Sequence, residues 1–141
     1  MPYATQAELE TRFGTDELVQ LTNRAGGNTI DAAVVASALV GASSEIDGYL
    51  ARRYAVPVSP APVFLGEACL SIARYKLHGK SAGDAVRRDY DDAIRLLRDL
   101  ADGRAEIAGA APPASSSVAG QVRIDAPGRQ LSRDQLADFT R

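Results

Sequence analysis

EIDGYLARRYAVP, residues 45–57, is the stretch that decides the fold. Its apolar side chains recur three or four residues apart, which is the spacing of one face of an α-helix. That stripe consists of Ile46, Tyr49 or Leu50, and Arg53 or Tyr54. Glu45 and Arg52 lie on the opposite side, and Pro57 is expected to end the helix, because proline lacks a backbone donor and disfavours a helical residue before it. The stretch therefore predicts the end of a long amphipathic helix that runs into a connector.

The same periodicity extends upstream of this stretch as far as Ile30. Apolar positions recur about every 3.5 residues, which is typical of a helix packed along other helices; they are Val35, Leu39, Ala42, Ile46 and Tyr49. We therefore predict a helix over residues 30–54, with Thr29 as its N-cap. Gly41 and Gly48 each weaken such a helix by about 1 kcal/mol relative to alanine, and they are tolerable if another backbone approaches closely there.

Two more long helices are predicted downstream of an extended connector. Three prolines within residues 57–62 keep the connector extended. A helix is expected over residues 63–78, ending at Gly79, and another over residues 83–102, ending at Gly103. Their apolar stripes are Leu65, Ala68 or Cys69, Ile72 and Tyr75 or Lys76 in the first, and Val86, Tyr90, Ala93 or Ile94, Leu97 and Leu100 in the second. On the outer face of the second we expect the ion pairs Asp84–Arg88 and Asp91–Arg95.

Two short helices are predicted at the N-terminus. Thr5 and Glu8 have the spacing of a capping box, in which each side chain bonds the other residue's backbone N–H. Gly14 is expected to end this helix, and Thr15 to cap a second one that continues to about Asn23. The fold class is therefore all-α: residues 1–107 form a bundle of about five helices, two short and three longer.

The chain changes character after Ile107. Residues 108–120 consist almost wholly of Ala, Pro, Ser and Gly, a composition that predicts a flexible linker. Residues 121–141 then form an arm in which residues 121–125 alternate like a short strand. The arm carries apolar residues with little core of their own: Val122, Ile124, Leu131, Leu136 and Phe139. Three alternatives are open for these residues: they fold back on the bundle, they have no partner, or they dock on another chain. The sequence favours docking.

Composition bounds the class of protein. The 141 residues suffice for one domain with a real core, and a 45% apolar content is ordinary for a globular protein. The formal net charge is −2. The single cysteine excludes an internal disulfide. We expect neither a secretory signal nor a membrane span, because no basic segment precedes an apolar run and no stretch of about 18 apolar residues exists.

No catalytic or metal-binding constellation is predicted. Cys69 and His78 are the only thiol and imidazole, and nine residues of helix hold them about 13 Å apart. A nucleophile and its base must come within about 3 Å, so we expect Cys69 to be a buried apolar group and His78 to be a helix cap or surface residue. Asp89, Asp91 and Asp92 point to different faces of one helix. We therefore expect no enzyme, no cofactor and no metal.

Nucleic-acid binding is the main alternative that the residues leave open. Arg52–Arg53 and Arg87–Arg88 are the adjacent basic pairs. The second pair lies among aspartates, so we expect it to be paired internally. The chain has no basic excess of the kind that a duplex-binding domain usually shows. A small helical DNA-binding or regulatory protein is thus the runner-up, and a salt-dependent shift of duplex DNA would favour it.

Three short segments, in this order, resemble segments of the small neck proteins of Mu-like tailed phages. They are MPYATQAELETRFG at residues 1–14, the stretch at 45–57, and IARYKLHG at residues 72–79. The resemblance covers residues 3–107. It returns at residues 133–139, RDQLADF, which is similar to the Arg-Asp-x-Leu-x-x-Phe ending of that family. Such proteins are similar in fold to the head–tail adaptors of siphophages.

The resemblance implies a structural protein in the neck of a virion, made in the host cytoplasm. It implies a homo-oligomeric ring, a dodecamer, beneath the portal protein, with a stopper or tail protein on its other side and DNA passing only passively through the lumen. The arm would dock through Ile124, Arg133, Leu136 and Phe139. The long helix would be oriented, or meet its neighbour at the ring seam, through Tyr49, Arg52 and Arg53. A stopper or tail terminator is the alternative within the virion, although stoppers are usually rich in β-structure.

Overall fold

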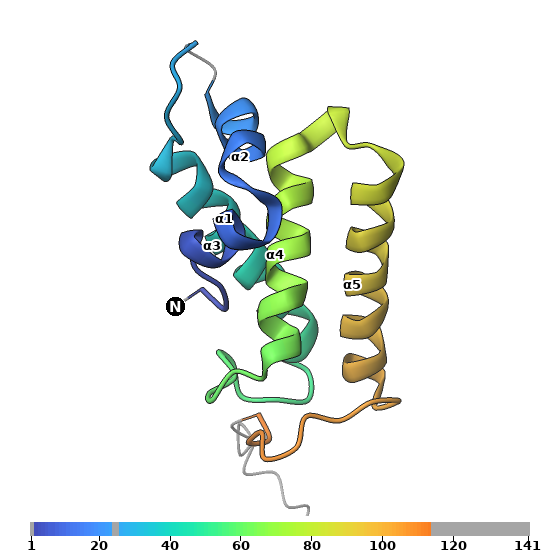
Figure 1. Ribbon diagram of the computed structural model, residues 1–141. Coiled ribbons are helices and arrows are strands. Elements are labelled where there is room, and N and C mark those ends of the chain that lie inside the picture. Colours follow the sequence, from blue (N-terminus) through green and yellow to red (C-terminus); the bar gives the residue numbers. More distant parts are fainter. Residues whose placement is uncertain (1, 24–25, 114–141) are drawn as a thin grey trace, which may run out of the picture.

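The fold consists of five α-helices and no strand, in a computed structural model that describes residues 2–23 and 26–113. The helices are α1 (Gln6–Phe13), α2 (Thr15–Thr22), α3 (Ala32–Leu50), α4 (Val63–His78) and α5 (Asp84–Asp102), with a 3₁₀ turn at Gly79–Ser81 between the last two (Figure 1). The prediction of an all-α bundle with two short N-terminal and three longer helices is confirmed. The predicted arm, residues 121–141, and its short strand lie outside the described residues.

The two short helices begin and end largely as local chemistry dictates. The Thr5 hydroxyl accepts from the Glu8 amide at 3.3 Å, and the Glu8 carboxylate accepts from the Thr5 amide at 2.7 Å. The capping box is therefore confirmed. Gly14 ends α1 with a φ of 87° and is at once the N-cap of α2. Thr15 is the first residue of α2 instead of its cap, because the left-handed glycine already provides the turn between the helices.

Helix α3 is shorter than its periodicity predicts, at both ends. Its N-cap is Asp31 and not Thr29: the Asp31 carboxylate accepts from the amides of Ala33 and Val34 at 3.0 and 3.3 Å. The helix ends at Leu50, well before Pro57. A further turn follows, in which the Tyr54 amide donates to the Leu50 carbonyl at 2.9 Å. Tyr54 is buried, and its hydroxyl accepts from the Ile107 amide at 3.2 Å.

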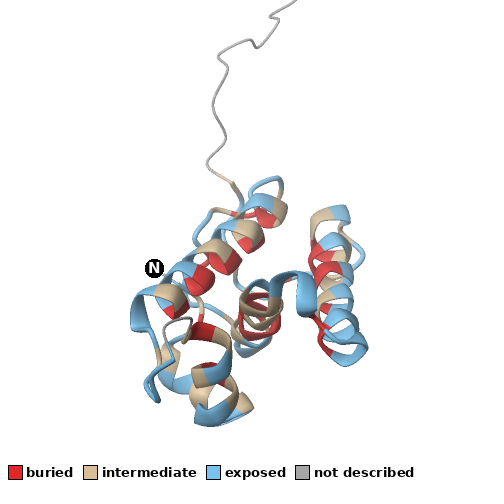
Figure 2. Ribbon diagram, turned by 90° about the horizontal axis from the view of Figure 1, so that it is seen from above, coloured by how far each residue is buried: buried red, intermediate tan, exposed pale blue. Residues whose placement is uncertain are grey.

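The core lies between α3, α4 and α5. Helix α4 packs against both of the others, and α1 and α2 cover α3 and α4 (Figure 1). Buried residues lie on the helix sides that face one another (Figure 2). The predicted stripes are confirmed at these positions: Val35, Leu39, Ala42, Ile46, Leu65, Cys69, Ile72, Val86, Ile94, Leu97 and Leu100 are buried. Tyr49 and Tyr90 are half-buried against this cluster.

The glycines of α3 are not sites of close backbone approach, contrary to expectation. A Cβ added at Gly41 would meet the Lys76 side chain at 3.6 Å, and one added at Gly48 would meet nothing within 4 Å. The close approach is at Gly66 of α4, where a Cβ would lie 3.3 Å from the Tyr3 carbonyl oxygen. There the N-terminal segment crosses α4, a contact between distant segments that helical periodicity does not encode.

The segment after α5 returns to the connector that follows α3. Gly103 ends α5 with a φ of 79°, and the guanidinium of Arg53 packs over it. Ile107 is buried, and the Ala55 amide donates to the Ala111 carbonyl at 2.9 Å. The start of the predicted linker therefore lies against the bundle, at the end where α4 begins (Figure 1). Residues 114–120 of that linker are outside the described part of the chain.

Candidate docking surface

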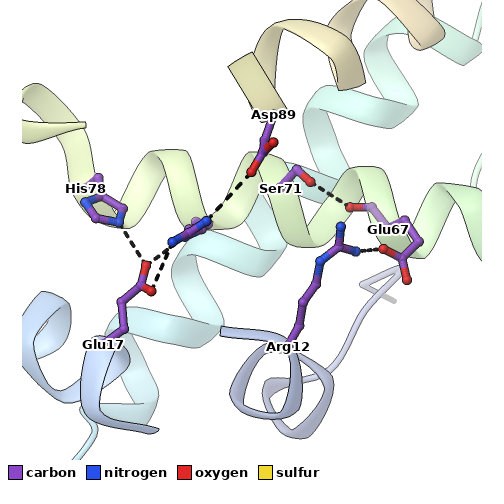
Figure 3. A network of polar contacts seen from close by, with 7 residues as sticks. Arg12, Glu17, Glu67, Ser71, His78 and Asp89 are labelled. Carbon is purple, nitrogen blue, oxygen red and sulfur yellow. Dashed lines mark hydrogen bonds and ion pairs between the residues drawn. The ribbon is translucent and has the colours of Figure 1, made fainter. Parts of the chain in front are cut away.

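The outward side of α4 forms the floor of a depression between α1 and α5, which we call the trough. Its first groove, of about 520 Å³, lies between the N-terminal segment, α1 and the start of α4. The second, of about 330 Å³, lies between α1, α4 and α5. Arg12 and Glu67 line both grooves and form an ion pair across α1 and α4 (Figure 3). This pair divides one continuous depression into two parts.

The trough combines an apolar floor with acidic walls. Leu70, Val63 and Pro62 contribute apolar surface to the first groove, and Phe64 and Leu96 to the second. Val63 is 84% exposed, which is unusual for a large apolar residue at a helix start. The charged residues lining the two grooves are four carboxylates and one guanidinium: Glu8, Glu67, Asp89, Asp92 and Arg12. Three of these carboxylates are paired with arginines: Glu67 with Arg12, Asp89 with Arg74, and Asp92 with Arg95. The trough is thus an apolar surface with a rim of mostly paired charges.

A polar network beside the trough ties α2 to α4 and α5. Arg74 donates to both oxygens of Glu17, at 2.7 and 3.0 Å, and its guanidinium lies 3.7 Å from Asp89. His78 Nε2 lies 3.1 Å from the same Glu17 carboxylate (Figure 3). Arg74 also stacks over the ring of Phe13, 4.4 Å from its centroid. Arg74 of α4 therefore contacts residues of three other helices, α1, α2 and α5.

Glu17 is the charge on which this network converges. Burial alone would raise the pKa of its carboxyl, but hydrogen bonds from Arg74 and His78 outweigh burial and hold the pKa below its usual value. The carboxylate form is therefore the one that the fold stabilises. The expectation of His78 as a cap or surface residue was wrong in this respect, since its side chain is only 18% exposed and reaches across to α2.

Neither the thiol nor the imidazole forms a catalytic pair in the described part of the chain. Cys69 is fully buried, its sulfur lies 3.5 Å from the Ser43 hydroxyl, and burial raises the pKa of the thiol. The prediction that Cys69 is a buried apolar group is confirmed. Among residues 2–23 and 26–113, no three His, Cys, Asp or Glu side chains gather in a way that would hold a metal ion. No helix there is long and apolar enough to cross a bilayer.

The outer face of α5 has fewer ion pairs between its own residues than the sequence predicts. The expected pairs Asp84–Arg88 and Asp91–Arg95 do not form; Arg95 contacts Asp92 instead, at 3.1 Å. Arg87 and Arg88 make no ion pair with any described residue, which corrects the expectation of internal pairing. The reason is direction: Asp89 turns toward Arg74 on α4, away from its basic neighbours.

The residues singled out for the long helix have different surroundings. Tyr49 packs against the core, Arg52 is exposed, and Arg53 lies 3.5 Å from Glu106. Arg53 thus forms an ion pair within its own subunit. The docking-arm residues Ile124, Arg133, Leu136 and Phe139 lie outside the described residues. Sequence reasoning did not single out the trough or the network beside it. The signal for the network was Arg74 and His78, two polar side chains one helical turn apart on a largely buried helix.

The described residues thus form a small five-helix protein with a trough on its outer surface. The family described as "Bacteriophage Mu, Gp36" matches residues 3–126, and the chain belongs to this family. It is 39% identical to "Mu-like prophage FluMu protein gp36" of Haemophilus influenzae over 101 residues, which are 72% of each chain. It is 33% identical to "Gene product J" of Escherichia phage Mu over 132 residues, 90% of this chain and 93% of that one.

Proposed function

We propose that this protein is a head–tail connector, a neck or adaptor protein that joins the portal of a phage head to the tail components. Membership of a phage Mu family supports a role in phage biology, and the all-α fold is the architecture expected of an adaptor. The observation that carries the proposal furthest is the trough. A closed core with an apolar depression outside it, rimmed by paired charges, has the properties of a protein whose surface is completed by another polypeptide.

The mechanism in this proposal is physical. Subunits stay soluble until identical side-to-side contacts, repeated with a fixed rotation, close into a ring. Arg52, at the end of the long helix, is exposed and free of ion pairs with described residues, so it suits the ring seam better than Arg53, which contacts Glu106. Tyr49 packs inward and would orient the helix. In this proposal the protein is structural and needs no cofactor.

The ring would meet the portal on one face and a stopper or tail protein on the other, in the neck of the virion. DNA would pass through its lumen without specific binding. Outside residues 114–141 the chain carries twelve basic and fifteen acidic side chains, since those residues hold four arginines and three aspartates. An acidic lining makes few counterion-releasing contacts with phosphates and so lets DNA slide.

The proposal is tested by removing the protein from the phage or prophage that encodes it. An early stop codon should yield DNA-filled heads and separate tails, and expression of the full chain in trans should restore joined particles. Joined, infectious particles in the complete absence of the protein would refute the connector role. In parallel, the purified chain mixed with the cognate portal protein should give a complex with a ring at one end in electron micrographs.

A further inference from the structure

The first groove of the trough has no charge left to pair. The Glu8 carboxylate accepts from the Thr5 amide at 2.7 Å, and Arg12 forms its ion pair with Glu67. The apolar side of the groove ends at Val63, which is 84% exposed. A charged side chain that entered this groove would lose its hydration without gaining a free partner. The groove therefore fits an occupant with small or apolar, uncharged side chains.

The first part of α3 has the composition of a helix that is covered on all sides. Residues 32–44 contain no Asp, Glu, Lys or Arg, whereas each of the other helices has charged residues on its exposed side. A helix without a charged face is normally buried all round. One side of α3 is nevertheless exposed, and its row of side chains three or four residues apart, which we call the ridge, consists of Ala33, Ala36, Ser37, Val40 and Ser44.

We propose that the first groove of each subunit receives the ridge of a neighbouring copy of this chain. This inference rests on the homo-oligomer of the proposed function and assigns the seam of its ring. The ridge and the groove share no residue, so the contact is heterologous, and such contacts close into a ring when they repeat with a suitable rotation. A subunit's own ridge cannot fill its own groove, because the other side of α3 is packed against α4.

The two surfaces match in apolar character, length and depth. Val63 at the groove and Val40 in the ridge, 59% exposed, are two of the three large apolar side chains exposed in the described residues, and docking would cover both. The groove follows α4 from Val63 to Leu70, about 11 Å, and the ridge from Ala36 to Ser44 is about 12 Å long. Alanine, serine and valine side chains let the α3 backbone come close, and they lose little rotamer freedom on docking.

The other exposed helix faces of a second copy are poorer occupants, because each would carry charge into the groove. Arg87 and Arg88 on the outer face of α5 have no ion pair with a described residue, and Asp16 on α2 has none either. Burying such a group without a partner costs more than the apolar contact around it contributes. The ridge is the exposed helix face in the described part of the chain that this groove can cover without that cost.

The test is disulfide trapping in assembled particles. A phage with an early stop codon in the gene of this protein is complemented with full-length Val40→Cys and Val63→Cys chains together. Joined particles are isolated and mildly oxidised, and linked forms of the chain are separated on a non-reducing gel. Asp91→Cys, exposed on α5 and outside both surfaces, replaces Val63→Cys as the matched control. The native Cys69 is fully buried and can stay.

The expected result is a disulfide-linked dimer from V40C with V63C, and none from either variant alone or from V40C with D91C. A chain with both V40C and V63C should give a ladder of larger multimers, because each subunit then links to two neighbours. Val40→Glu should lower the yield of joined particles at least about tenfold, since every seam would bury an unpaired carboxylate. Ala85→Glu, at an exposed site of α5, should not, and both should keep the wild-type Tm.

Three results would overturn the inference. A dimer from V40C alone would show that the ridge meets a second ridge. Joined particles that contain both cysteine chains without any link between them would leave the groove to the portal or to another segment. Wild-type yields of joined particles with V40E would show that the ridge is not at a seam. Each of these results leaves the connector role standing, whereas joined particles that lack the chain altogether refute that role.

Discussion

Replacing Arg74 with alanine should destabilise the whole bundle, although the residue lies on no predicted apolar stripe. The substitution removes a guanidinium that donates twice to Glu17, approaches Asp89 and stacks on Phe13. It also leaves the partly buried Glu17 carboxylate with His78 as its remaining partner in the network. The loss is therefore larger than that of an ordinary surface ion pair.

The magnitude follows from exposure. Exposed ion pairs contribute about 0–1 kcal/mol, whereas removing one partner of a fully buried pair costs about 3–5 kcal/mol. The side chains of Arg74 and Glu17 are 20% and 27% exposed, between these limits. With about 0.5–1 kcal/mol for the stacking on Phe13, we expect a loss of about 2–3 kcal/mol. For a unit of this size that corresponds to a fall in Tm of about 8–12 °C.

Urea and thermal unfolding, followed by far-ultraviolet circular dichroism, measure the loss. Arg95→Ala is the matched control, because Arg95 forms an exposed pair with Asp92 and should cost less than about 0.5 kcal/mol. In a double-mutant cycle, Glu17→Gln should cost at least about 1 kcal/mol less in the Arg74→Ala background than in the wild type. Equal losses for the two arginine variants, or additive losses in the cycle, would refute the reasoning.

The same carboxylate gives this prediction a pH dependence with a definite sign. The folded state lowers the pKa of Glu17, so its contribution is present above the unfolded pKa of about 4.3 and is lost as the pH falls through the lowered folded value. Wild-type stability should therefore fall on acidification more steeply than that of Glu17→Gln. Parallel acid profiles for the two proteins would mean that the network does not hold the carboxylate.

Alkaline pH should destabilise the fold between about pH 10 and 12, because burial and carboxylate neighbours raise the pKa of Tyr3 and of Tyr90 to about 12. Urea unfolding midpoints measured across this pH range test the prediction. Replacing both tyrosines with phenylalanine should flatten the pH profile. Gly103→Ala should cost about 1–2 kcal/mol, since the site has a φ of 79° and a guanidinium packs over it, while Gly48→Ala, in open helix, should stabilise by about 0.5–1 kcal/mol. Removing residues 114–141 should leave the Tm of dilute protein nearly unchanged but abolish particle assembly; a large loss of helical signal on truncation would place that segment in the core.

Local signals predicted most of the helices because their causes are local. Helix α4 begins at Val63 and ends at His78 as expected, since the prolines before it and Gly79 after it act through their own backbones. The buried stripe of α5 is equally direct, because its apolar residues keep one period over the whole helix. The contact between Tyr54 and Ile107 was missed, because the two residues are 53 positions apart.

The trough could not be predicted for the same reason. Glu17 and Arg74 are 57 residues apart, and Glu17 and His78 are 61 apart. Each charge by itself is consistent with a solvated helix face, and only the crossing of α2 over α4 brings them together. A groove depends on the space between helices, which periodicity within one helix does not contain. The sequence therefore favoured docking by the arm without indicating any groove on the bundle.

The two walls of the trough are held in different ways, and this bears on how it would accept an occupant. Ile94, Leu97 and Leu100 anchor α5 through buried apolar surface, which salt affects little. The opposite wall, α1, buries one leucine, Leu9, and is tied to α4 by the Arg12–Glu67 ion pair. Elements with few buried apolar contacts open at lower free energy than the rest of a fold. The N-terminal wall is therefore the one that would adjust when a segment enters, while α4 and α5 keep the floor and the far wall fixed.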